Sequence, residues 1–413
     1  MKPTHRKYKL LKHTSKLLAL LLGSALASGA TGVLAADPKP RPLAPLPAVP
    51  VPTDNPMSAA KVELGKLLFF DTKITGDASV SCADCHDPKM GWGFSDPISR
   101  GYPGTVHWRN SNTAVNSAYL GKTFWQGDAL SLEAQGEAAN TGSVAGNGAN
   151  DVMEARLRQT PEYVKRFKEV FGTERPLIHD VWYAVAAFER GPLVQKDSPL
   201  DRYLKGDKNA LSAQAVKGKA LFEGKANCIR CHDGPMLTDE KFYNLGLPRP
   251  KEFEESGIHQ ISFRWEMYQK GIDEQKYRDF KDDPGLYHST VRAKDAGKHR
   301  TAPLRYIKYT QPYMHAGQLF TLEEVIDFYD KGGGENEFTK QFGNKAKALK
   351  PLNLTKDEKE SLLAFLEELS GEEIKMAVPQ VPQYGVDPDV AGLTQAKAKR
   401  IGLETHLSAT GKK

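Results

Sequence analysis

A five-residue motif, C-x-x-C-H, occurs twice in this chain, at residues 82–86 (CADCH) and 228–232 (CIRCH). The motif is typical of c-type haem attachment, in which two thiols bond to the haem vinyl groups and the adjacent histidine binds the iron. A redox-active dithiol or half of a zinc site is the alternative, but zinc sites usually add a second Cys or His pair at short spacing. The two histidines are 232 − 86 = 146 residues apart. We therefore expect two covalently bound haem c groups.

The two motifs use all four cysteines of the chain, so none remains for a disulfide or another thiolate site. The expected haem-attachment residues are Cys82, Cys85, Cys228 and Cys231, and the expected proximal iron ligands are His86 and His232.

Residues 1–35 have the pattern of an export signal: a basic region, an apolar run at 17–27 and small residues near Ala35. The apolar run is short for a membrane span, so we expect none after cleavage; an uncleaved anchor is the alternative. The signal holds six basic residues and no acidic ones, while the whole chain carries +6, so the mature chain is near neutral. Its charge gives no reason to expect a nucleic-acid partner. Bacterial c-type haem is attached outside the cytoplasm, and we expect a periplasmic protein.

The remaining chain has mostly helical periodicity and no convincing series of alternating strands. The expected helices are residues 58–70, 161–171, 178–188, 213–222, 322–329 and 356–369. Each haem motif follows one of these helices, which predicts two haem domains. The expected divisions are a signal peptide (1–35), a stiff Pro-rich leader (36–56), an N-terminal haem domain (57–200), a C-terminal haem domain (201–373) and a peripheral tail (374–413).

Several motifs in this order resemble the bacterial di-haem cytochrome c peroxidases and the related MauG-like enzymes. Beyond the haem motifs, the resemblance rests on residues 64–71 (LGKLLFFD), 109–110 (RN), 124–127 (FWQG), 132–135 (LEAQ), 300–305 (RTAPLR), 312–317 (PYMHAG) and 321–325 (TLEEV). It covers roughly residues 58–369 and implies a mainly α fold of two cytochrome-c-like haem domains packed against each other. It also implies that the N-terminal haem reacts with peroxide and that the C-terminal haem stores or relays an electron.

The second axial ligand of the C-terminal haem decides the subclass. In the peroxidases this ligand is a methionine at a fixed step after the histidine of the P-Y-x-H-x-G motif, and the same step from His315 reaches Tyr329. MauG-like enzymes place a tyrosine there, and a phenolate is a hard anionic donor that lowers the haem potential. The resemblance therefore implies Tyr329 as ligand. The alternative is that Tyr329 is a core aromatic and that Met314 or another methionine binds the iron.

The distal side of the N-terminal haem departs from the peroxidase pattern. Tyr102 stands where the peroxidases carry a histidine that caps the iron, and His107 nearby is either a substitute cap or a solvated loop residue. The family pairs a distal glutamine with a glutamate ten residues later. Gln135 matches the glutamine, but residues 143–146 (SVAG) hold no carboxylate. Breaking the O–O bond requires a group that moves a proton, so ordinary peroxidase chemistry is in doubt unless Glu137 reaches in.

Two further features are implied by the resemblance. Trp125 corresponds to the family's tryptophan between the haems, where an oxidisable indole relays an electron hole; core packing is the alternative for a buried Trp. Asn110, Thr310 and Pro312 match the calcium ligands, the first through its side chain and the others through backbone carbonyls. Oxygen donors of this kind suit Ca²⁺. We expect one calcium ion in addition to the two haems.

These features leave three functions open. We favour a MauG-like oxidase that uses H₂O₂ at the His86 haem and oxidises a Trp or Tyr of a partner protein by long-range electron transfer, because of Tyr329 and the missing histidine cap. The alternative is a cytochrome c peroxidase that reduces H₂O₂ to water with electrons from a small c-type cytochrome or cupredoxin. The third is an electron carrier or haem sensor without enzymatic activity. The expected partners are hydrogen peroxide and a protein substrate or electron-donor protein.

Overall fold

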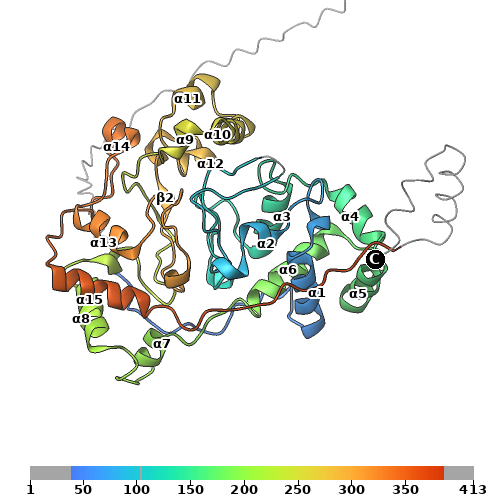
Figure 1. Cartoon of the computed structure of the whole chain (residues 1–413), viewed down its shortest axis with the longest axis horizontal. Helices are drawn as coiled ribbons and strands as arrows, with labels where there is room; N and C mark the ends of the chain where they lie inside the picture. The colour runs from blue at the N-terminus through green and yellow to red at the C-terminus, as the bar shows by residue number, and fades with distance from the viewer. Residues whose placement is uncertain (1–38, 103–104, 386–413) are drawn as a thin grey trace, which may run out of the picture. The chain divides into compact units, whose positions relative to one another are not determined.

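Helices make up most of the regular secondary structure of the described chain, residues 39–102 and 105–385, in this computed structural model (Figure 1). The signal peptide and the end of the tail lie outside the described residues. The first half contains α1 (Ala59–Phe69), α2 (Cys82–Cys85), α3 (Leu132–Thr141), α4 (Asn150–Arg158), α5 (Pro161–Phe171), α6 (Ile178–Arg190) and the 3₁₀ helices η1 (Thr72–Ile74), η2 (Pro88–Met90) and η3 (Ser117–Tyr119).

The second half adds further helices and two short strands. The helices are α7 (Pro199–Leu204), α8 (Ala213–Glu223), α9 (Glu252–Glu255), α10 (Gly257–Gln269), α11 (Glu274–Asp279), α12 (Tyr287–Thr290), α13 (Leu322–Asp330), α14 (Glu337–Phe342), α15 (Lys356–Glu367), η4 (Cys228–Arg230), η5 (Ala293–Asp295) and η6 (Ile307–Tyr309). The strands β1 (Phe242–Tyr243) and β2 (His299–Arg300) form one antiparallel pair. None of the described helices is both long and apolar enough to span a membrane.

All six helices predicted from periodicity are confirmed, as α1, α5, α6, α8, α13 and α15. Ser58, Ser212 and Thr355 are the N-caps of α1, α8 and α15, since each side chain accepts a hydrogen bond from a first-turn amide. Thr160 precedes α5 without capping it, because its hydroxyl donates to the Arg156 carbonyl instead. That helix begins with Pro161, whose fixed φ suits the first turn.

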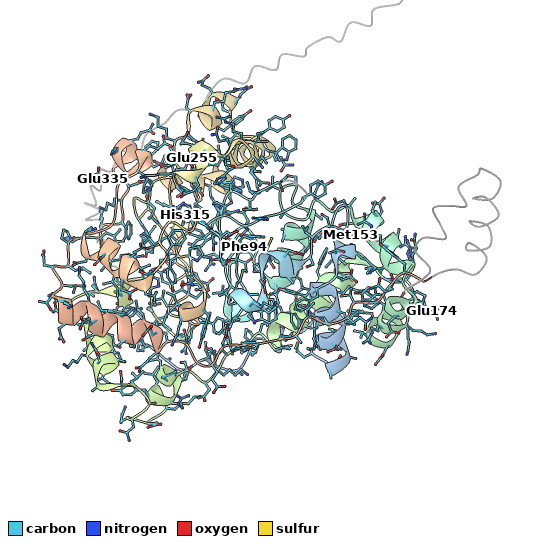
Figure 2. The ribbon with its side chains drawn as sticks, viewed as in Figure 1. Phe94, Met153, Glu174, Glu255, His315 and Glu335 are labelled. Atoms are coloured by element: carbon cyan, nitrogen blue, oxygen red, sulfur yellow. The ribbon has the colours of Figure 1, made fainter. Side chains whose placement is uncertain are left out.

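The first hydrophobic core forms where α1 crosses α6. Gly65 allows the close approach, because a Cβ atom there would lie 1.8 Å from the Ala184 carbonyl oxygen. Phe69, Trp92 and Phe188 fill this core with ring centroids 5.3–6.0 Å apart. Met153 of α4 is buried in the same core, and the side-chain view labels it there (Figure 2).

The second core repeats the same crossing with α8 and α15. A Cβ atom at Gly218 would lie 1.9 Å from the Ser361 carbonyl oxygen, and Phe222 packs edge-on against Phe365 at 5.3 Å. Each core therefore holds one helix pair with a haem motif after its first helix. Residues 40–385 belong to one compact unit. The expected boundary between two haem domains at residues 200 and 201 stays a prediction.

The Pro-rich leader and the start of the tail are both packed against the helical cores. In the leader, Leu43 is buried in the second core, and the guanidinium of Arg41 donates to the Asp233 carboxylate at 2.6 Å. In the tail, the carbonyl of Ile374 accepts from the indole of Trp92 at 2.8 Å. Residues 374–385 are therefore attached to the first core.

Candidate haem sites

The first C-x-x-C-H motif coincides with the short helix α2. Ser81 begins this helix, and its amide and hydroxyl donate to the Asp84 carboxylate at 2.6 and 2.7 Å. Burial raises the pKa of Cys82 and of Cys85 to about 12. The two sulfur atoms therefore lie in an apolar setting, which suits thioether bonds to a porphyrin.

Both motif histidines make the same kind of contact, from Nδ1 to a backbone carbonyl. The Nδ1 atom of His86 lies 3.2 Å from the carbonyl oxygen of Trp92, and that of His232 lies 3.1 Å from the carbonyl oxygen of Leu237. A carbonyl only accepts, so Nδ1 carries the proton and Nε2 keeps the lone pair that binds iron. Trp92 and Leu237 have φ values of +60° and +51°, a region that bulky residues rarely occupy. The chain thus accepts backbone strain at both sites to orient a ligand.

A cavity of about 250 Å³ lies at the second motif. Cys228, Cys231 and His232 line it together with mainly aliphatic side chains such as Val325, Ile326, Leu362 and Leu366. Burial raises the pKa of Cys228 to about 12 and of Cys231 to about 11. Two thiols, a correctly oriented imidazole and an apolar wall are what a c-type haem requires, so the residues present fit this group.

Tyr329 of α13 lines the same cavity. Burial raises its pKa, and the attachment residues Cys228 and Cys231 line the cavity with it. Met314 also lines the cavity. The shared cavity of the phenol and both cysteines favours Tyr329 as the second ligand, and this assignment stays a prediction.

The segment that leads to α3 and carries Trp125 and Gln135 has a second copy that leads to α13 and carries His315 and Tyr329. Corresponding positions in the two copies are 190 residues apart. Each copy has a left-handed residue, a 3₁₀ helix, a β-bridge around a second left-handed residue and a left-handed glycine, and then a capped helix. The corresponding positions are Asn116 and Tyr306, η3 and η6, Thr123–Ala129 and Tyr313–Leu319, Phe124 and Met314, Gly127 and Gly317, Ser131 and Thr321, and α3 and α13.

This duplication compares the distal sides directly. Tyr329 on α13 corresponds to Ala139 on α3, because 139 + 190 = 329. The helix α3 lies beside the first motif, since the amide nitrogen of Asn140 is 4.0 Å from the Cys82 sulfur. The position that presents a phenol at the second haem therefore presents only a methyl group at the first. Sequence reasoning missed this equivalence, although an internal comparison at this offset would have found it.

Gln135 lies one helical turn before Ala139, and so on the same face of α3. The buried ion pair between Glu133 and Arg190 fixes this helix on α6 at 2.5 Å. Glu137 is exposed and lies on the opposite side of α3, which does not support the idea that it reaches into the site.

Tyr102 belongs to a segment beside the first motif. The amide of Tyr102 donates to the Ala145 carbonyl at 2.6 Å, and the Cys85 sulfur donates to the Arg100 carbonyl at 2.8 Å. Tyr102 therefore adjoins the loop that lacks the family carboxylate. His107 is half-buried, its Nδ1 accepts from the Arg109 amide at 3.2 Å, and burial lowers its pKa to about 4. The interpretation of His107 as a solvated loop residue is wrong.

Trp125 and the three predicted calcium ligands line one cavity, the same cavity that contains His232. The Trp125 indole donates to the Asn110 carbonyl at 2.9 Å. The Asn110 side-chain nitrogen donates to the carbonyls of Phe94 and Asp96, so its amide oxygen keeps its acceptor capacity. The predicted oxygen donors, Asn110, Thr310 and Pro312, are thus brought together from distant parts of the sequence.

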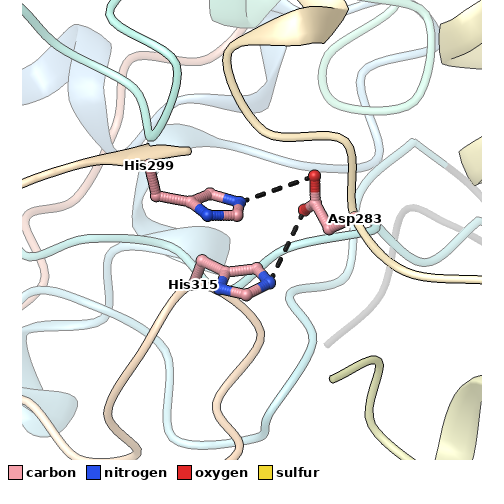
Figure 3. Close-up of side chains that lie close together, drawn as sticks. All are labelled: Asp283, His299 and His315. Carbon is pink, nitrogen blue, oxygen red and sulfur yellow. Dashed lines mark ion pairs between the residues drawn. The ribbon is translucent and has the colours of Figure 1, made fainter. Parts of the chain in front are cut away.

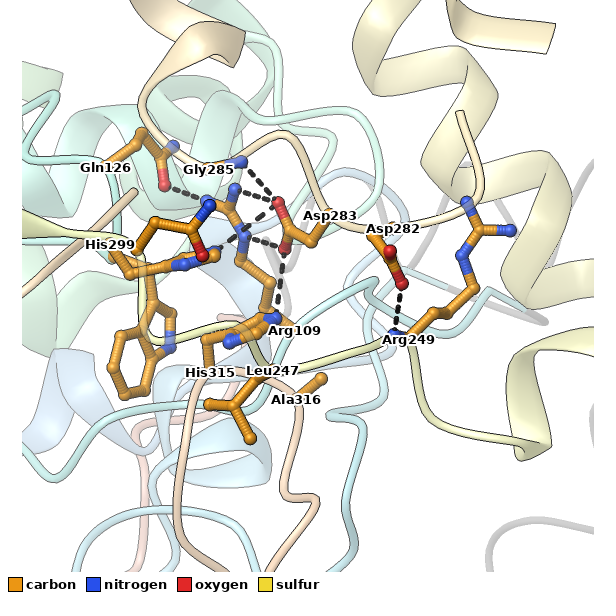
Figure 4. A network of polar contacts seen from close by, with 12 residues as sticks. Arg109, Gln126, Leu247, Arg249, Asp282, Asp283, Gly285, His299, His315 and Ala316 are labelled. Atoms are coloured by element: carbon orange, nitrogen blue, oxygen red, sulfur yellow. Dashed lines mark hydrogen bonds and ion pairs between the residues drawn. The ribbon is translucent and has the colours of Figure 1, made fainter. Parts of the chain in front are cut away.

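A buried polar cluster next to this cavity was not predicted. Asp283, His299 and His315 place their polar atoms within 4.8 Å of one another, and the two imidazole rings stack at 3.8 Å (Figure 3). Arg109 occupies both oxygens of Asp283 at 2.7 Å and also bonds Gln126 (Figure 4). Since the guanidinium already supplies the positive charge that a metal ion would bring, we interpret the cluster as a link between segments 109–126 and 283–315.

Comparison with known proteins agrees with this arrangement. The sequence profile of the family "Di-haem cytochrome c peroxidase" matches residues 59–209. The chain is 50% identical over 354 residues to cytochrome-c peroxidase IdrP1 of Pseudomonas sp. (strain SCT), covering 86% of this chain and 92% of that protein. It is 35% identical over 337 residues to the methylamine utilization protein MauG of Methylorubrum extorquens, covering 81% and 85%.

A solved structure has the same fold. The crystal structure of a MauG-like protein associated with microbial copper homeostasis superposes with a TM-score of 0.66 at 30% identity, covering 80% of this chain and 94% of that chain. The chain belongs to the di-haem cytochrome c peroxidase and MauG family. It is a mainly α haem peroxidase of this class.

Proposed function

We propose that this protein is an exported cytochrome c peroxidase that reduces H₂O₂ to water with electrons from a small c-type cytochrome or cupredoxin. The observation that carries the proposal is the 50% identity, over 92% of its length, to a protein named cytochrome-c peroxidase. This reverses the order of our two leading sequence-based hypotheses, since MauG itself is more distant at 35%.

The two haems supply the iron chemistry, and the chain determines where each reaction occurs. His86 and His232, each with Nδ1 fixed by a carbonyl, would hold the iron through Nε2. At the first site, the face of α3 that carries Ala139 presents a methyl group in place of a ligand, and the Gln135 amide on the same face can donate and accept hydrogen bonds. Trp125 relays charge between the sites, and Tyr329 closes the second site.

A calcium ion held by Asn110, Thr310 and Pro312 belongs to the same proposal. The ion would join the segment before Trp125 to the segment before His315, and so fix the path between the haems. Oxygen donors from an amide and two backbone carbonyls suit this hard cation. Export to the periplasm is supported by the haem motifs and the signal-like N-terminus.

Steady-state oxidation of a reduced small cytochrome c by H₂O₂ tests the function. We expect turnover in the wild type and a loss of roughly 100-fold in Gln135→Ala, within the range for a positioned catalytic group. Glu137→Gln is the matched control, because this exposed residue of the same helix faces away. A wild-type holoprotein that oxidises no cytochrome or cupredoxin would contradict the proposal.

MauG-like oxidation of a partner protein is the second candidate, and the position of Tyr329 in the same cavity as Cys228 and Cys231 favours it. The two functions differ in the fate of the oxidising equivalents. Mass spectrometry of co-expressed exported proteins after peroxide treatment would reveal a cross-linked or oxygenated Trp or Tyr if this function holds.

A further inference from the structure

Tyr243 is one of the residues that surround the second haem site. It pairs with His299 in the β1–β2 ladder and lines the cavity that contains His232. Cys231 lines the same cavity. Since Cys231 would carry the haem through a thioether bond, Tyr243 would face the pocket that holds the cofactor.

The phenol also has a built-in proton acceptor. The Tyr243 hydroxyl donates to Asp239 Oδ2 at 2.7 Å, and the Asp239 side chain is only 5% exposed. Two backbone bonds hold this carboxylate in place: the Asp239 amide donates to the Cys231 carbonyl at 2.8 Å, and the Lys241 amide donates to Asp239 Oδ1 at 2.9 Å. Tyr243 itself is half-buried, so one side of the ring faces the haem site while part remains accessible.

Oxidation of a phenol requires loss of both an electron and a proton. Burial and the bond to Asp239 raise the pKa of Tyr243, so the hydroxyl is protonated at physiological pH. A carboxylate at 2.7 Å accepts the proton without diffusion, as in general base catalysis. The described residues contain other phenol–carboxylate pairs, Tyr163 with Asp71 and Tyr183 with Asp54, but neither of these tyrosines lines the cavity that contains His232.

We propose that Tyr243 and Asp239 form a redox-active pair that passes electrons to the second haem. This inference rests on the proposed function, in which hydrogen peroxide is the oxidant. The Tyr243 O–H bond breaks, one electron passes to the oxidised haem at His232, and the proton moves to Asp239, which leaves a neutral tyrosyl radical and a carboxylic acid. An electron from the donor protein and the proton from Asp239 then restore the phenol and the carboxylate.

The test is freeze-quench EPR of the holoprotein after addition of H₂O₂ without a donor protein. We expect a free-radical signal that narrows when the tyrosines are ring-deuterated and that is lost in Tyr243→Phe. Tyr183→Phe is the matched control, because it removes a phenol bonded to a carboxylate at 3.0 Å on α6; it should retain the signal. Asp239→Asn should reduce the radical yield roughly tenfold or more, since the proton acceptor is removed.

The outcomes separate this inference from the proposed function. Visible spectra with both haems intact would establish that Tyr243→Phe is folded and loaded. A signal of equal intensity in that variant, or no tyrosyl signal in a wild type that turns over with a cytochrome donor, would overturn the role of Tyr243. A wild type that does not turn over would instead reject the peroxidase proposal.

Discussion

The two haem sites share their proximal geometry and differ on the distal side. Each has a glycine-mediated helix crossing, a half-buried cysteine pair and a histidine whose Nδ1 bonds the carbonyl of a left-handed residue. The duplicated distal helices then present Ala139 at the first site and Tyr329 at the second. The comparison teaches that attachment and histidine orientation are common to both sites, whereas the two copies of the repeated helix differ at the position of Ala139 and Tyr329. We propose that this one side chain separates a site for peroxide from a site for electrons.

The two halves also differ in the second helix of each crossing pair, which is α6 against α1 in the first half and α15 against α8 in the second. The offset of 177 residues between Ala184 and Ser361 makes Leu366 the counterpart of Glu189. Glu189 is 6% exposed, accepts from the Ser117 hydroxyl at 3.1 Å, and has a pKa raised by burial to about 7. The first half therefore buries a carboxyl group where the second half buries an aliphatic side chain.

The largest effect is expected from copying the second distal side into the first. Ala139→Tyr places a phenol where peroxide must enter. If the phenol leaves the first iron accessible in only about one molecule in a thousand, the reaction of the holoprotein with H₂O₂ should slow roughly 1,000-fold. Stopped-flow absorbance measures this rate. Ala138→Tyr, at the exposed neighbouring position, is the control and should react like the wild type. Equal rates in Ala139→Tyr and the wild type would break the proposed correspondence between α3 and α13.

Glu189→Gln tests the buried carboxyl group of the first half. The pKa of Glu189 is raised from 4.5 to about 7, so the folded state binds the proton more tightly and stability falls as pH rises between these values. At pH 8 the variant should gain up to about 3 kcal/mol in free energy of unfolding, and at pH 4 it should gain none. Denaturant unfolding at both pH values measures this. Glu367→Gln, on the exposed face of α15, should show no such pH dependence.

Tyr329→Met sharpens the comparison at the second site. A thioether favours the ferrous state relative to a phenolate, so the potential of this haem should rise by roughly 100 mV or more. Spectroelectrochemical titration of the two haems measures the shift. Tyr313→Phe, which removes another phenol that lines the same cavity, should leave the potential unchanged. If Tyr329→Met leaves both potentials unchanged, Tyr329 is not a ligand.

The smallest effect is expected at the connection between the sites. Trp125→Phe removes the oxidisable indole and its bond to Asn110, and electron transfer between the haems should slow roughly tenfold, equivalent to about 1.4 kcal/mol in activation free energy. Peroxide binding at the first haem should be unaffected. Rapid-mixing spectroscopy separates the two steps, and equal inter-haem rates would mean that charge takes another path.

The sequence predicted those parts of the molecule that depend on local patterns. Periodicity located all six expected helices. The haem motifs were identified from their spacing, and Tyr329 as a ligand, implied by the family resemblance, stays a prediction. The cluster of Asp283, His299 and His315 was missed because these residues meet only after folding. The correspondence of Ala139 with Tyr329 was also missed, although a comparison of the sequence with itself at an offset of 190 residues would have found it.

Binding of a small anion to the oxidised holoprotein, followed by EPR, addresses the difference between the two sites directly. Azide or cyanide should change the signal of one haem, that of the first site, and leave the other unchanged, because in our proposal Tyr329 would bind the second iron while Ala139 would leave the first open. Titration of Tyr329→Phe alongside the wild type assigns the signals, since the second haem should then bind the anion as well. Anion binding at both wild-type haems, or at neither, would contradict the proposed division of labour.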